Sequence, residues 1–334
     1  MRRALIAVLV AATTLVLVPS AASAGKGGGS GTAPKRSAGC RDATAIAPGE
    51  EQVTLVSDHV ERWYFRHVPP TYDGTTPLPL VVDLHGYLEG ATIHATHSKL
   101  GQFGDTHGFI TLTPNGTGEP VHWEVGLRSA DVRFISRLLD EAEDSLCIDT
   151  RRIFVTGLSN GAIFTSILAC TLADRIAAVA PVAGVREFLR CRPDRPVPVV
   201  AFHGTEDQVL SFDGGLGPIG LNLPTDEPGQ TIGQLRPDLA KGKSIPDTAA
   251  AWAKRNGCKK KPTEEEIAPD VTLVRYSSCD EGATVELYEI IGGGHTWPGS
   301  EFSAVIENAV GHVTFSIDAN EVMWAFFEDH PLKG

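Results

Sequence analysis

The sequence predicts an α/β protein in which helices cover both faces of a mostly parallel sheet. Short apolar, β-branched runs alternate with longer segments of helical spacing, which is typical of parallel strands joined by helices. Three of these runs lead directly into polar residues, at His85, Ser159 and His203. Because parallel strands end at the same edge of a sheet, this arrangement predicts one site at that edge. The 334 residues, with 42% hydrophobic content, suffice for one large domain.

The individual elements follow from length, periodicity and residue type. The expected strands cover residues 52–57, 62–68, 78–84, 108–113, 152–156, 176–182, 197–202, 271–276 and 284–291. We expect the first two to form an antiparallel pair at the edge of the sheet. The expected helices cover residues 131–146, 162–170, 247–255 and 318–329. Asp131 is the expected N-cap of the first helix.

The N-terminal segment predicts export. Arg2 and Arg3 precede an uncharged apolar run, and Ala22-Ser23-Ala24 has the small residues of a cleavage site. We therefore expect a signal peptide over 1–24, a flexible Gly/Ser-rich linker over 25–39 and one catalytic domain over 40–334. The apolar run is too short for a comfortable membrane span, so we expect a secreted, extracellular protein with no anchor after cleavage.

Charge and cysteine content narrow the possible partners. Without the two signal-peptide arginines, 27 basic side chains face 41 acidic ones, a net charge of −14, which argues against nucleic acid and anionic lipid. Six cysteines in an exported chain predict disulfides, of which fifteen connectivities are possible. We expect Cys258–Cys279, Cys170–Cys191 and Cys40–Cys147, although the sequence does not fix the pairing. No cysteine spacing indicates a metal site.

A nucleophilic serine is predicted at Ser159. It is the centre of Gly157-Leu158-Ser159-Asn160-Gly161, which lies between a strand pattern and a helix pattern. A serine hydroxyl is a poor nucleophile unless a sharp turn presents it beside a base. The two glycines would allow strand and helix to pack closely around such a turn.

The acid and base of a triad are expected downstream, in that order. Asp207 lies just after the strand 197–202, with Glu206 and Asp213 as competing candidates. His295 follows the last strand within Gly292-Gly293-Gly294-His295-Thr296-Trp297-Pro298-Gly299 and is preferred as base over His312 and His330. We expect His203 to have a structural role beneath the acid loop.

The remaining site residues are predicted from position. An oxyanion hole needs two backbone N–H groups, for which we propose those of Tyr87 and Asn160. The rings of Tyr87 and Trp297 are candidates for a clamp on an apolar acyl group, whereas Trp123 is expected to pack in the core. The Gly- and Pro-rich segment 210–245 is either a flap at the cleft or a solvated insertion. Asn115 begins a glycosylation sequon.

These motifs resemble the polyhydroxybutyrate depolymerase family of esterases. The resemblance rests on Leu84-His85-Gly86, the Ser159 pentapeptide, 178–184, 202–207 and the Gly-Gly-Gly-His-Thr-Trp-Pro-Gly block. It implies an α/β-hydrolase fold close to feruloyl and acetylxylan esterases, with Ser159 as nucleophile, Asp207 as acid and His295 as base. Ala162 departs from a glycine that the family often has.

We therefore predict a secreted serine carboxylesterase that needs no cofactor and hydrolyses hydroxyalkanoate polyester or oligomers. Feruloyl or acetyl esters of plant polysaccharide are alternative substrates. An acyltransferase would share the acyl-enzyme but exclude water, and a silent binding protein could use the same scaffold. The sequence does not determine the oligomeric state.

Overall fold

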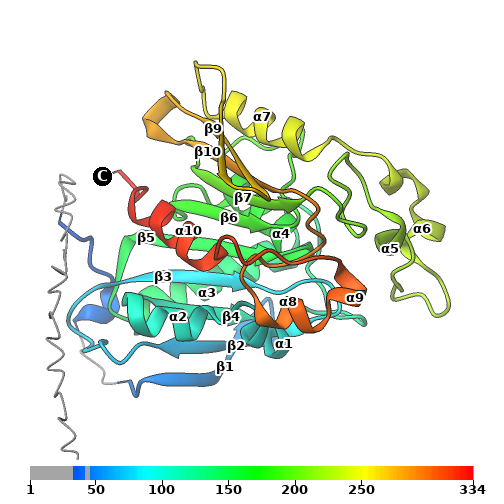
Figure 1. Ribbon diagram of the computed structural model, residues 1–334. Helices are drawn as coiled ribbons and strands as arrows, with labels where there is room; N and C mark the ends of the chain where they lie inside the picture. The colour runs from blue at the N-terminus through cyan, green and yellow to red at the C-terminus, as the bar shows by residue number, and fades with distance from the viewer. Residues whose placement is uncertain (1–32, 42–45, 334) are drawn as a thin grey trace, which may run out of the picture. The chain divides into compact units, whose positions relative to one another are not determined.

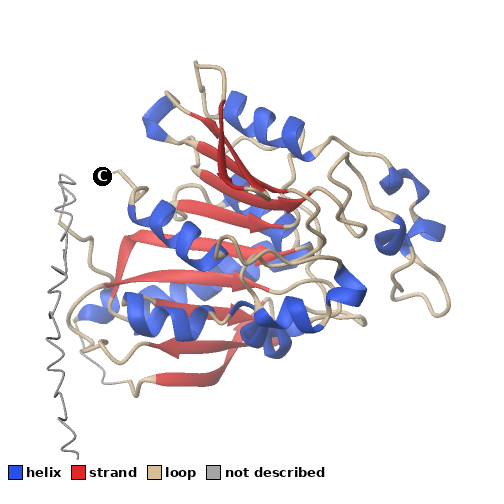
Figure 2. Cartoon of the chain, in the orientation of Figure 1, coloured by secondary structure: helices blue, strands red, loops and turns tan. Residues whose placement is uncertain are grey.

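The chain is built on one ten-stranded sheet (Figure 2). The computed structural model describes residues 33–41 and 46–333, and the chain from Pro34 onward forms one compact unit. The strands are β1 (Gly49–Ser57), β2 (Val60–Val68), β3 (Leu78–Leu84), β4 (Ile110–Pro114), β5 (Ile148–Leu158), β6 (Ala178–Val182), β7 (Val199–Gly204), β8 (Thr263–Ala268), β9 (Val271–Tyr276) and β10 (Val285–Ile290). Their spatial order is β1-β2-β4-β3-β5-β6-β7-β10-β9-β8.

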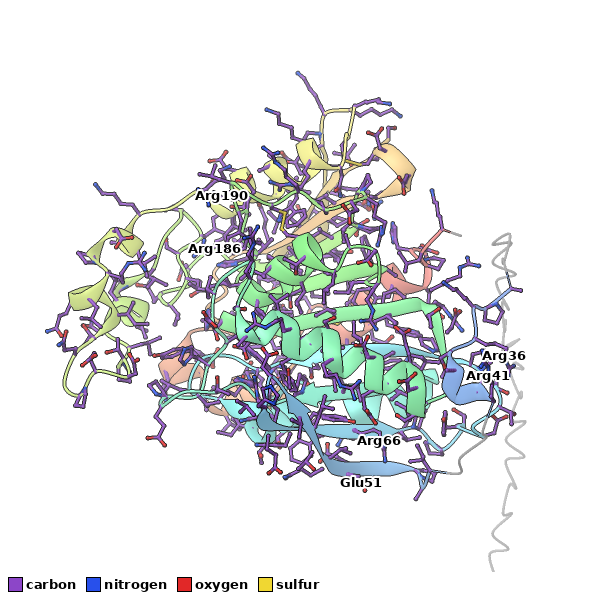
Figure 3. The ribbon with its side chains drawn as sticks, turned by 180° about the vertical axis from the view of Figure 1, so that it is seen from behind. Arg36, Arg41, Glu51, Arg66, Arg186 and Arg190 are labelled. Carbon is purple, nitrogen blue, oxygen red and sulfur yellow. A yellow bond between two sulfur atoms is a disulfide. The ribbon has the colours of Figure 1, made fainter. Side chains whose placement is uncertain are left out.

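The centre of the sheet is parallel and its two edges are antiparallel. The strands from β4 through β10 in that spatial order pair in parallel, whereas β1 with β2, β2 with β4, β10 with β9 and β9 with β8 pair antiparallel. The predicted parallel sheet and the predicted antiparallel pair at its edge are therefore confirmed. Arg66 and Glu51, labelled in Figure 3, form an ion pair across this edge at 2.6 Å.

Helices cover both faces of the sheet (Figure 1). One face packs against α3 (Ala130–Ser145), α4 (Asn160–Thr171) and α7 (Ile245–Arg255), and the other against α2 (Leu100–His107) and α10 (Ala319–Glu328). The remaining helices are α1 (Gly90–Ser98), α5 (Pro218–Leu221), α6 (Ile232–Leu235), α8 (Glu301–Val305) and α9 (Glu307–Val310), with three 3-10 turns at Ala38–Cys40, Pro237–Ala240 and Asp280–Gly282.

The helix α1 was not predicted because its buried face is mostly polar. Its buried residues include His94, His97 and Ser98 at helical spacing, rather than aliphatic side chains. The strand β8 was also missed, since its side chains are mostly exposed and include three consecutive glutamates. A search for apolar periodicity finds neither kind of element.

The predicted N-cap of α3 is wrong. Ser129 caps this helix by accepting a hydrogen bond from the N–H of Val132. Asp131 instead lies inside the first turn, where its carboxylate forms a buried ion pair with Arg62 at 2.9 Å. A serine two positions earlier has the same capping chemistry, so the sequence pattern alone does not separate the two.

The predicted linker ends earlier than residue 39. Ser37 is buried and donates its hydroxyl hydrogen bond to the carbonyl of Leu146 at 2.5 Å, and the N–H of Lys35 binds the carboxylate of Asp149 at 2.9 Å. The segment from Lys35 onward is therefore part of the folded unit. The predicted signal peptide lies outside the described residues.

All three predicted disulfides are confirmed. They are Cys40–Cys147, Cys170–Cys191 and Cys258–Cys279. The first fixes the N-terminal segment to the start of β5, and the second joins the C-terminal end of α4 to the loop before β7. Among the described helices, none is both long enough and apolar enough to cross a bilayer.

We expect Cys40–Cys147 to contribute most to stability, because it closes the longest loop. Its cysteines are 107 residues apart, against 21 for each other pair. In the chain-entropy model these loops correspond to about 4.7 and about 3 kcal/mol. Denaturant unfolding of double Cys→Ser variants should therefore show a larger loss for Cys40/Cys147 than for Cys170/Cys191. Equal losses would contradict the loop-length argument.

Candidate active site

Ser159 occupies a strained turn between β5 and α4. Its φ of 59° and ψ of −116° lie in a region that L side chains rarely adopt. A Cβ on Gly157 would lie 2.6 Å from the carbonyl oxygen of Leu84, and one on Gly161 would collide with the same oxygen. The two glycines therefore allow β3, β5 and α4 to approach closely enough to hold the turn.

Asp207 and His295 meet although 88 residues separate them. Asp207 follows β7, His295 follows β10, and these two strands are parallel neighbours. His295 Nδ1 lies 2.7 Å from Asp207 Oδ2. The other carboxylate oxygen, Oδ1, accepts hydrogen bonds from the N–H groups of Val209 (2.7 Å) and Leu210 (2.9 Å). This geometry fixes the orientation of both side chains.

The alternative candidates for the acid and the base do not form the Asp207–His295 pair's contacts. His312 pairs with Glu307 at 2.7 Å, and His330 binds the carbonyl of Phe326. Within the described residues, neither Glu206 nor Asp213 forms a hydrogen bond or ion pair with His295. Asp207 is therefore the carboxylate that can orient this imidazole.

Two histidines keep Asp207 ionised. Burial opposes ionisation of this carboxyl group, but the charge and hydrogen bond of His295 and those of His203 outweigh it, so the pKa of Asp207 lies well below its usual range. His203 is buried beneath the loop, with Nε2 2.7 Å from the carbonyl oxygen of Leu210 and 3.3 Å from Asp207 Oδ2. This contact supports its predicted structural role.

Ser159 and His295 line one cavity of about 380 Å³. Its walls are predominantly apolar and are formed by Leu88, Ile93, Ile219, Leu223, Phe302 and Ile306, among others. Ile219 and Leu223 belong to the segment 210–245, whose α5 therefore borders the cavity. A serine hydroxyl and an oriented imidazole that line the same apolar cavity can carry out nucleophilic acyl transfer.

The predicted oxyanion donors come from two segments that adjoin Ser159. Asn160 is the first residue of α4, so its N–H has no partner within the helix. Its side-chain oxygen accepts the N–H of Trp123 at 2.7 Å, which fixes the helix start. Tyr87 follows Gly86, and a Cβ on Gly86 would lie 3.5 Å from Ser159 Cβ. The Tyr87 hydroxyl binds the carbonyl of Pro224 at 2.9 Å, which ties this loop to segment 210–245.

The predicted role is wrong for Trp297 and right for Trp123. Trp297 is only 1% exposed, packs in the core and donates its indole N–H to Asn320 at 3.0 Å. It does not line the cavity with Ser159, so the predicted clamp is wrong for this residue. Trp123 is fully buried and stacks on Phe164, which confirms the predicted packing role.

A buried polar network supports the Gly86–Glu89 loop. Glu89 Oε2 accepts the N–H of Gly86 at 2.7 Å and faces His94 Nδ1 at 3.1 Å. Glu89 Oε1 faces His97 Nδ1 at 2.7 Å. His97 Nε2 in turn meets Ser303 Oγ, which accepts the N–H of Trp297. Glu89 and His97 thereby connect the loop that carries Tyr87 to the one that carries His295.

The network requires a charged His94. Its Nε2 lies 2.7 Å from Asp83 Oδ1 while its Nδ1 faces Glu89, and a neutral imidazole has only one N–H to donate. Burial alone would lower the pKa of His94, but Asp83 and Glu89 outweigh it and raise the pKa to about 10. Burial likewise opposes ionisation of Glu89, yet His94 and His97 hold its pKa well below the usual range.

Three side chains of this network, Glu89, His94 and His97, lie close enough together to bind one metal ion. The ligand atoms of Glu89, His94 and His97 lie within 4.8 Å of one another, a cluster that the sequence did not reveal. Each of the four ring nitrogens already faces a hydrogen-bond partner, from Asp83 on one side to Ser303 on the other. Hydrogen bonds among the side chains therefore account for the cluster. The sequence signal for this cluster is the spacing of two histidines after Glu89, at positions 94 and 97.

His85 fixes the start of the same loop. Its Nδ1 binds the carbonyl of Gly86 at 2.7 Å, and its Nε2 accepts the N–H of Gly116 at 2.8 Å. Burial lowers its pKa to about 4, so the ring is neutral at pH 7, as these two bonds require. His85 is therefore a structural residue of the site.

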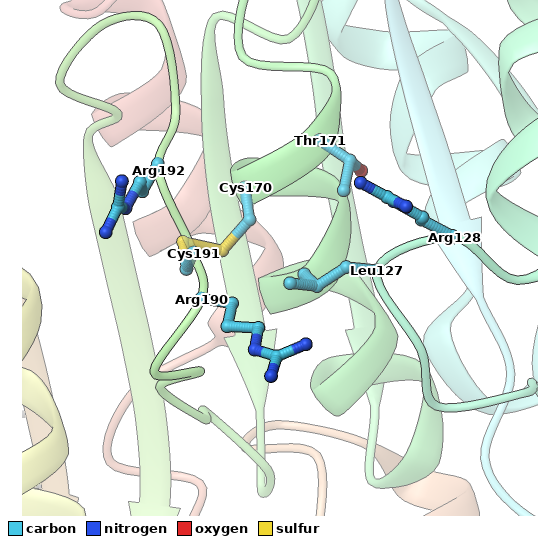
Figure 4. A pocket seen from close by; sticks show the side chains of 7 residues that line it. All are labelled: Leu127, Arg128, Cys170, Thr171, Arg190, Cys191 and Arg192. Atoms are coloured by element: carbon cyan, nitrogen blue, oxygen red, sulfur yellow. A yellow bond between two sulfur atoms is a disulfide. The ribbon is translucent and has the colours of Figure 1, made fainter.

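A separate cavity of about 540 Å³ lies at the opposite end of α4 (Figure 4). It is lined by the Cys170–Cys191 disulfide together with Leu127, Thr171 and three arginines. Ser159, Asp207 and His295 do not line it. This cavity is therefore distinct from the one that contains Ser159.

The comparisons with known proteins point to esterases. No protein-family model matches the chain. The chain is 30% identical over 237 residues to feruloyl esterase B of Piromyces equi, covering 68% of this chain but 41% of that protein. It is 30% identical over 240 residues to the putative esterase NocK of Nocardia uniformis subsp. tsuyamanensis, covering 67% of each.

Two further similarities extend this group. The chain is 26% identical over 246 residues to poly(3-hydroxyalkanoate) depolymerase C of Paucimonas lemoignei, covering 70% of this chain and 58% of that protein. Among solved structures, the acetyl xylan esterase from Aspergillus awamori matches with a TM-score of 0.55 at 15% identity, covering 78% of this chain and 98% of that one. This structural likeness concerns the fold alone.

The charged His94 should make stability fall at high pH. Because its pKa is raised from 6.5 to about 10, its contribution is fully present below about pH 6.5 and is lost as the pH rises through about 10. His94→Gln leaves two buried carboxylates without their cation, a loss of about 3–5 kcal/mol at pH 7.

We therefore expect the difference in Tm between wild type and His94→Gln to narrow between pH 7 and pH 10.5. The exposed, ion-paired His312 provides a control, and His312→Gln should change Tm little at either pH. A difference for His94→Gln that stays constant with pH would contradict a charged His94.

Proposed function

Because the chain belongs to the esterases of the α/β-hydrolase superfamily, a group with feruloyl and acetylxylan esterases and a poly(3-hydroxyalkanoate) depolymerase, we propose that it is a secreted serine carboxylesterase. The observation that carries this proposal is the 2.7 Å contact between His295 and Asp207, together with the cavity that His295 and the strained Ser159 both line. The chain spans 41% of the Piromyces enzyme, so its own activity and substrate are inferred from its site.

The proposed mechanism passes through an acyl-enzyme. Ser159 Oγ attacks the ester carbonyl while His295 Nε2 accepts its proton, and Asp207 stabilises the resulting imidazolium. The N–H groups of Tyr87 and Asn160 donate to the developing oxyanion. His295 then protonates the departing alkoxide. Water, activated by the same imidazole, releases the acid and restores Ser159.

The preferred substrates are hydroxyalkanoate oligomers or polyester. The apolar cavity can hold an aliphatic acyl portion, and the similarity to poly(3-hydroxyalkanoate) depolymerase C supports this class. A feruloyl ester of polysaccharide is the second candidate, favoured by the similarity to feruloyl esterase B and by Phe302 in the cavity wall. Acetylxylan is a third candidate.

Secretion is proposed from two features. The N-terminal signal-peptide pattern implies export, and three disulfides among the described residues suit an oxidising compartment. Detection of the mature chain outside the producing cell, with an N-terminus near residue 25, would support it.

We expect Ser159→Ala to lower the hydrolysis of p-nitrophenyl butyrate by at least about 10⁴-fold with Tm little changed, because it removes the nucleophile. Ser145→Ala, a change at the end of α3 away from the cavity, is the matched control and should keep full activity. Retained turnover in Ser159→Ala would refute the mechanism. Silence of the wild-type protein on every ester tested would instead favour a binding protein on the same scaffold.

The apolar cavity predicts a preference for longer acyl chains. Each buried methylene contributes about 0.8 kcal/mol, so kcat/KM should rise about fourfold per methylene from acetyl to butyryl esters. Phe302→Ala should weaken this trend and also reduce turnover of methyl ferulate. Phe315→Ala, which alters an exposed phenylalanine outside the cavity, is the control. A preference for acetyl esters would contradict this reading of the cavity.

A further inference from the structure

A third cavity lies beside the N-terminal part of α4. It has a volume of about 470 Å³ and lies between α4 and the segment 210–245. Ile163, one helical turn beyond Ser159, forms part of its wall, together with Leu216 and Leu239 of that segment. This cavity and the apolar one described above thus both adjoin the N-terminal part of α4, and both are bordered by segment 210–245.

Arg186 is the notable charged residue in this wall. Its backbone is fixed, since its N–H binds Ser166 Oγ at 3.1 Å and its carbonyl accepts the indole N–H of Trp252 at 2.9 Å. Its side chain, by contrast, makes one long hydrogen bond, from Nη2 to the carbonyl of Gly215 at 3.3 Å. Among the described residues, no carboxylate lies within 4.0 Å of its guanidinium. Burial lowers the pKa of Arg186, an effect that the charge of Asp207 opposes.

No carboxylate in the described wall of this cavity is free to pair with Arg186, and Asp207, whose charge acts on it, does not line this cavity. Glu187 is the one acidic residue in the described cavity wall, and its two oxygens already bind Arg255 (2.9 Å) and Lys243 (2.8 Å). Lys241 adds another positive charge to the wall. The chain has a net charge of −12, so its overall composition does not explain a positively charged cavity. Partly buried cations normally have a negative partner, because desolvating a lone charge is unfavourable.

We propose that this cavity binds a free carboxylate on the ester substrate and that Arg186 is the residue that recognises it. A guanidinium presents two parallel N–H groups that match a carboxylate, and the apolar side chains around it suit an aliphatic carbon skeleton. The inference rests on the proposed esterase function and narrows its substrate class. The enzyme would act on esters with an apolar acyl portion and a carboxylate-bearing alcohol portion.

A linear 3-hydroxyalkanoate oligomer has this construction at one end. The alcohol portion of its last ester bond carries the free terminal carboxylate. Attack by Ser159 on the carbonyl carbon of this last ester bond would release one hydroxy acid, whose hydroxyl oxygen takes its proton from His295. The shortened chain would stay on Ser159 as an acyl-enzyme until water removes it. A uronate on a polysaccharide offers the same carboxylate from another source.

The decisive measurement is the ratio of kcat/KM for a 3-hydroxybutyrate trimer to that for its methyl-capped form. A charged hydrogen bond contributes about 1.5–3 kcal/mol, so the wild-type enzyme should prefer the free acid by about 10- to 100-fold, less at high salt. Arg186→Gln should bring this ratio close to one. Arg190→Gln is the matched control, since Arg190 lies four residues along the same segment but lines the separate cavity (Figure 3). It should leave the ratio unchanged.

Two additional experiments distinguish the source of the carboxylate and replace the variant if it does not fold. Comparing acetylated xylan with and without uronate substituents distinguishes the sources of the carboxylate, because a preference confined to the uronate-bearing polymer would point away from oligomers. If Arg186→Gln does not fold, competitive inhibition of the wild-type enzyme by 3-hydroxybutyrate, but not by its amide, supports the same site.

The outcome also separates this inference from the proposed function. If wild type hydrolyses no ester, that function fails, while calorimetric binding of 3-hydroxybutyrate to Ser159→Ala still tests the cavity. Hydrolysis with no preference for the free acid, or a preference that Arg186→Gln leaves intact, would overturn the carboxylate site and leave the esterase function standing.

Discussion

The site depends on the strained backbone at Ser159. Only a close contact among β3, β5 and α4 can hold this conformation, and two glycines make that contact possible. The oxygen that they approach belongs to Leu84, whose strand leads directly into the His85–Glu89 loop. The packing that holds Ser159 in this turn therefore also sets the distance to one of its proposed oxyanion donors. The proposed nucleophile and the proposed oxyanion loop are positioned by one steric constraint.

Parallel strand pairing brings together the other two residues of the proposed triad. Because β7 and β10 are neighbours, the loops after them meet, and Asp207 reaches His295. Two carboxylates, of Asp207 and Glu89, stabilise the loops after β7 and β3 at this edge of the sheet. Asp207 binds two backbone N–H groups as well as His295, and Glu89 binds the N–H of Gly86 as well as two histidines. Such groups are stable in a dry interior only when every donor and acceptor is matched.

The two cavities beside α4 give the cleft its chemical character. One is apolar and contains Ser159 and His295, and the other presents Arg186 without a carboxylate partner. The segment 210–245 contributes to both, through Leu223 in the first and Leu216 in the second. Of the two interpretations that its composition allowed, these contacts favour a flap at the cleft over a solvated insertion. Selection among the proposed substrates would then depend on this segment more than on the sheet, which positions the proposed reactive groups.

The sequence by itself predicted the parallel sheet and the pairing of Asp207 with His295, because each leaves a local signal at the end of a strand. It left the cysteine pairing open, and the structure decided it. Only the tertiary structure decided what Trp297, Glu89 and Arg186 do. An aromatic ring packs well in either a core or a binding cleft, so sequence pattern does not separate the two positions. In the structure, Trp297 lies in the core. Polar networks such as the one at Glu89 have no sequence period, since their partners come from distant elements. A missing partner, as at Arg186, becomes visible only when all neighbouring charges are known.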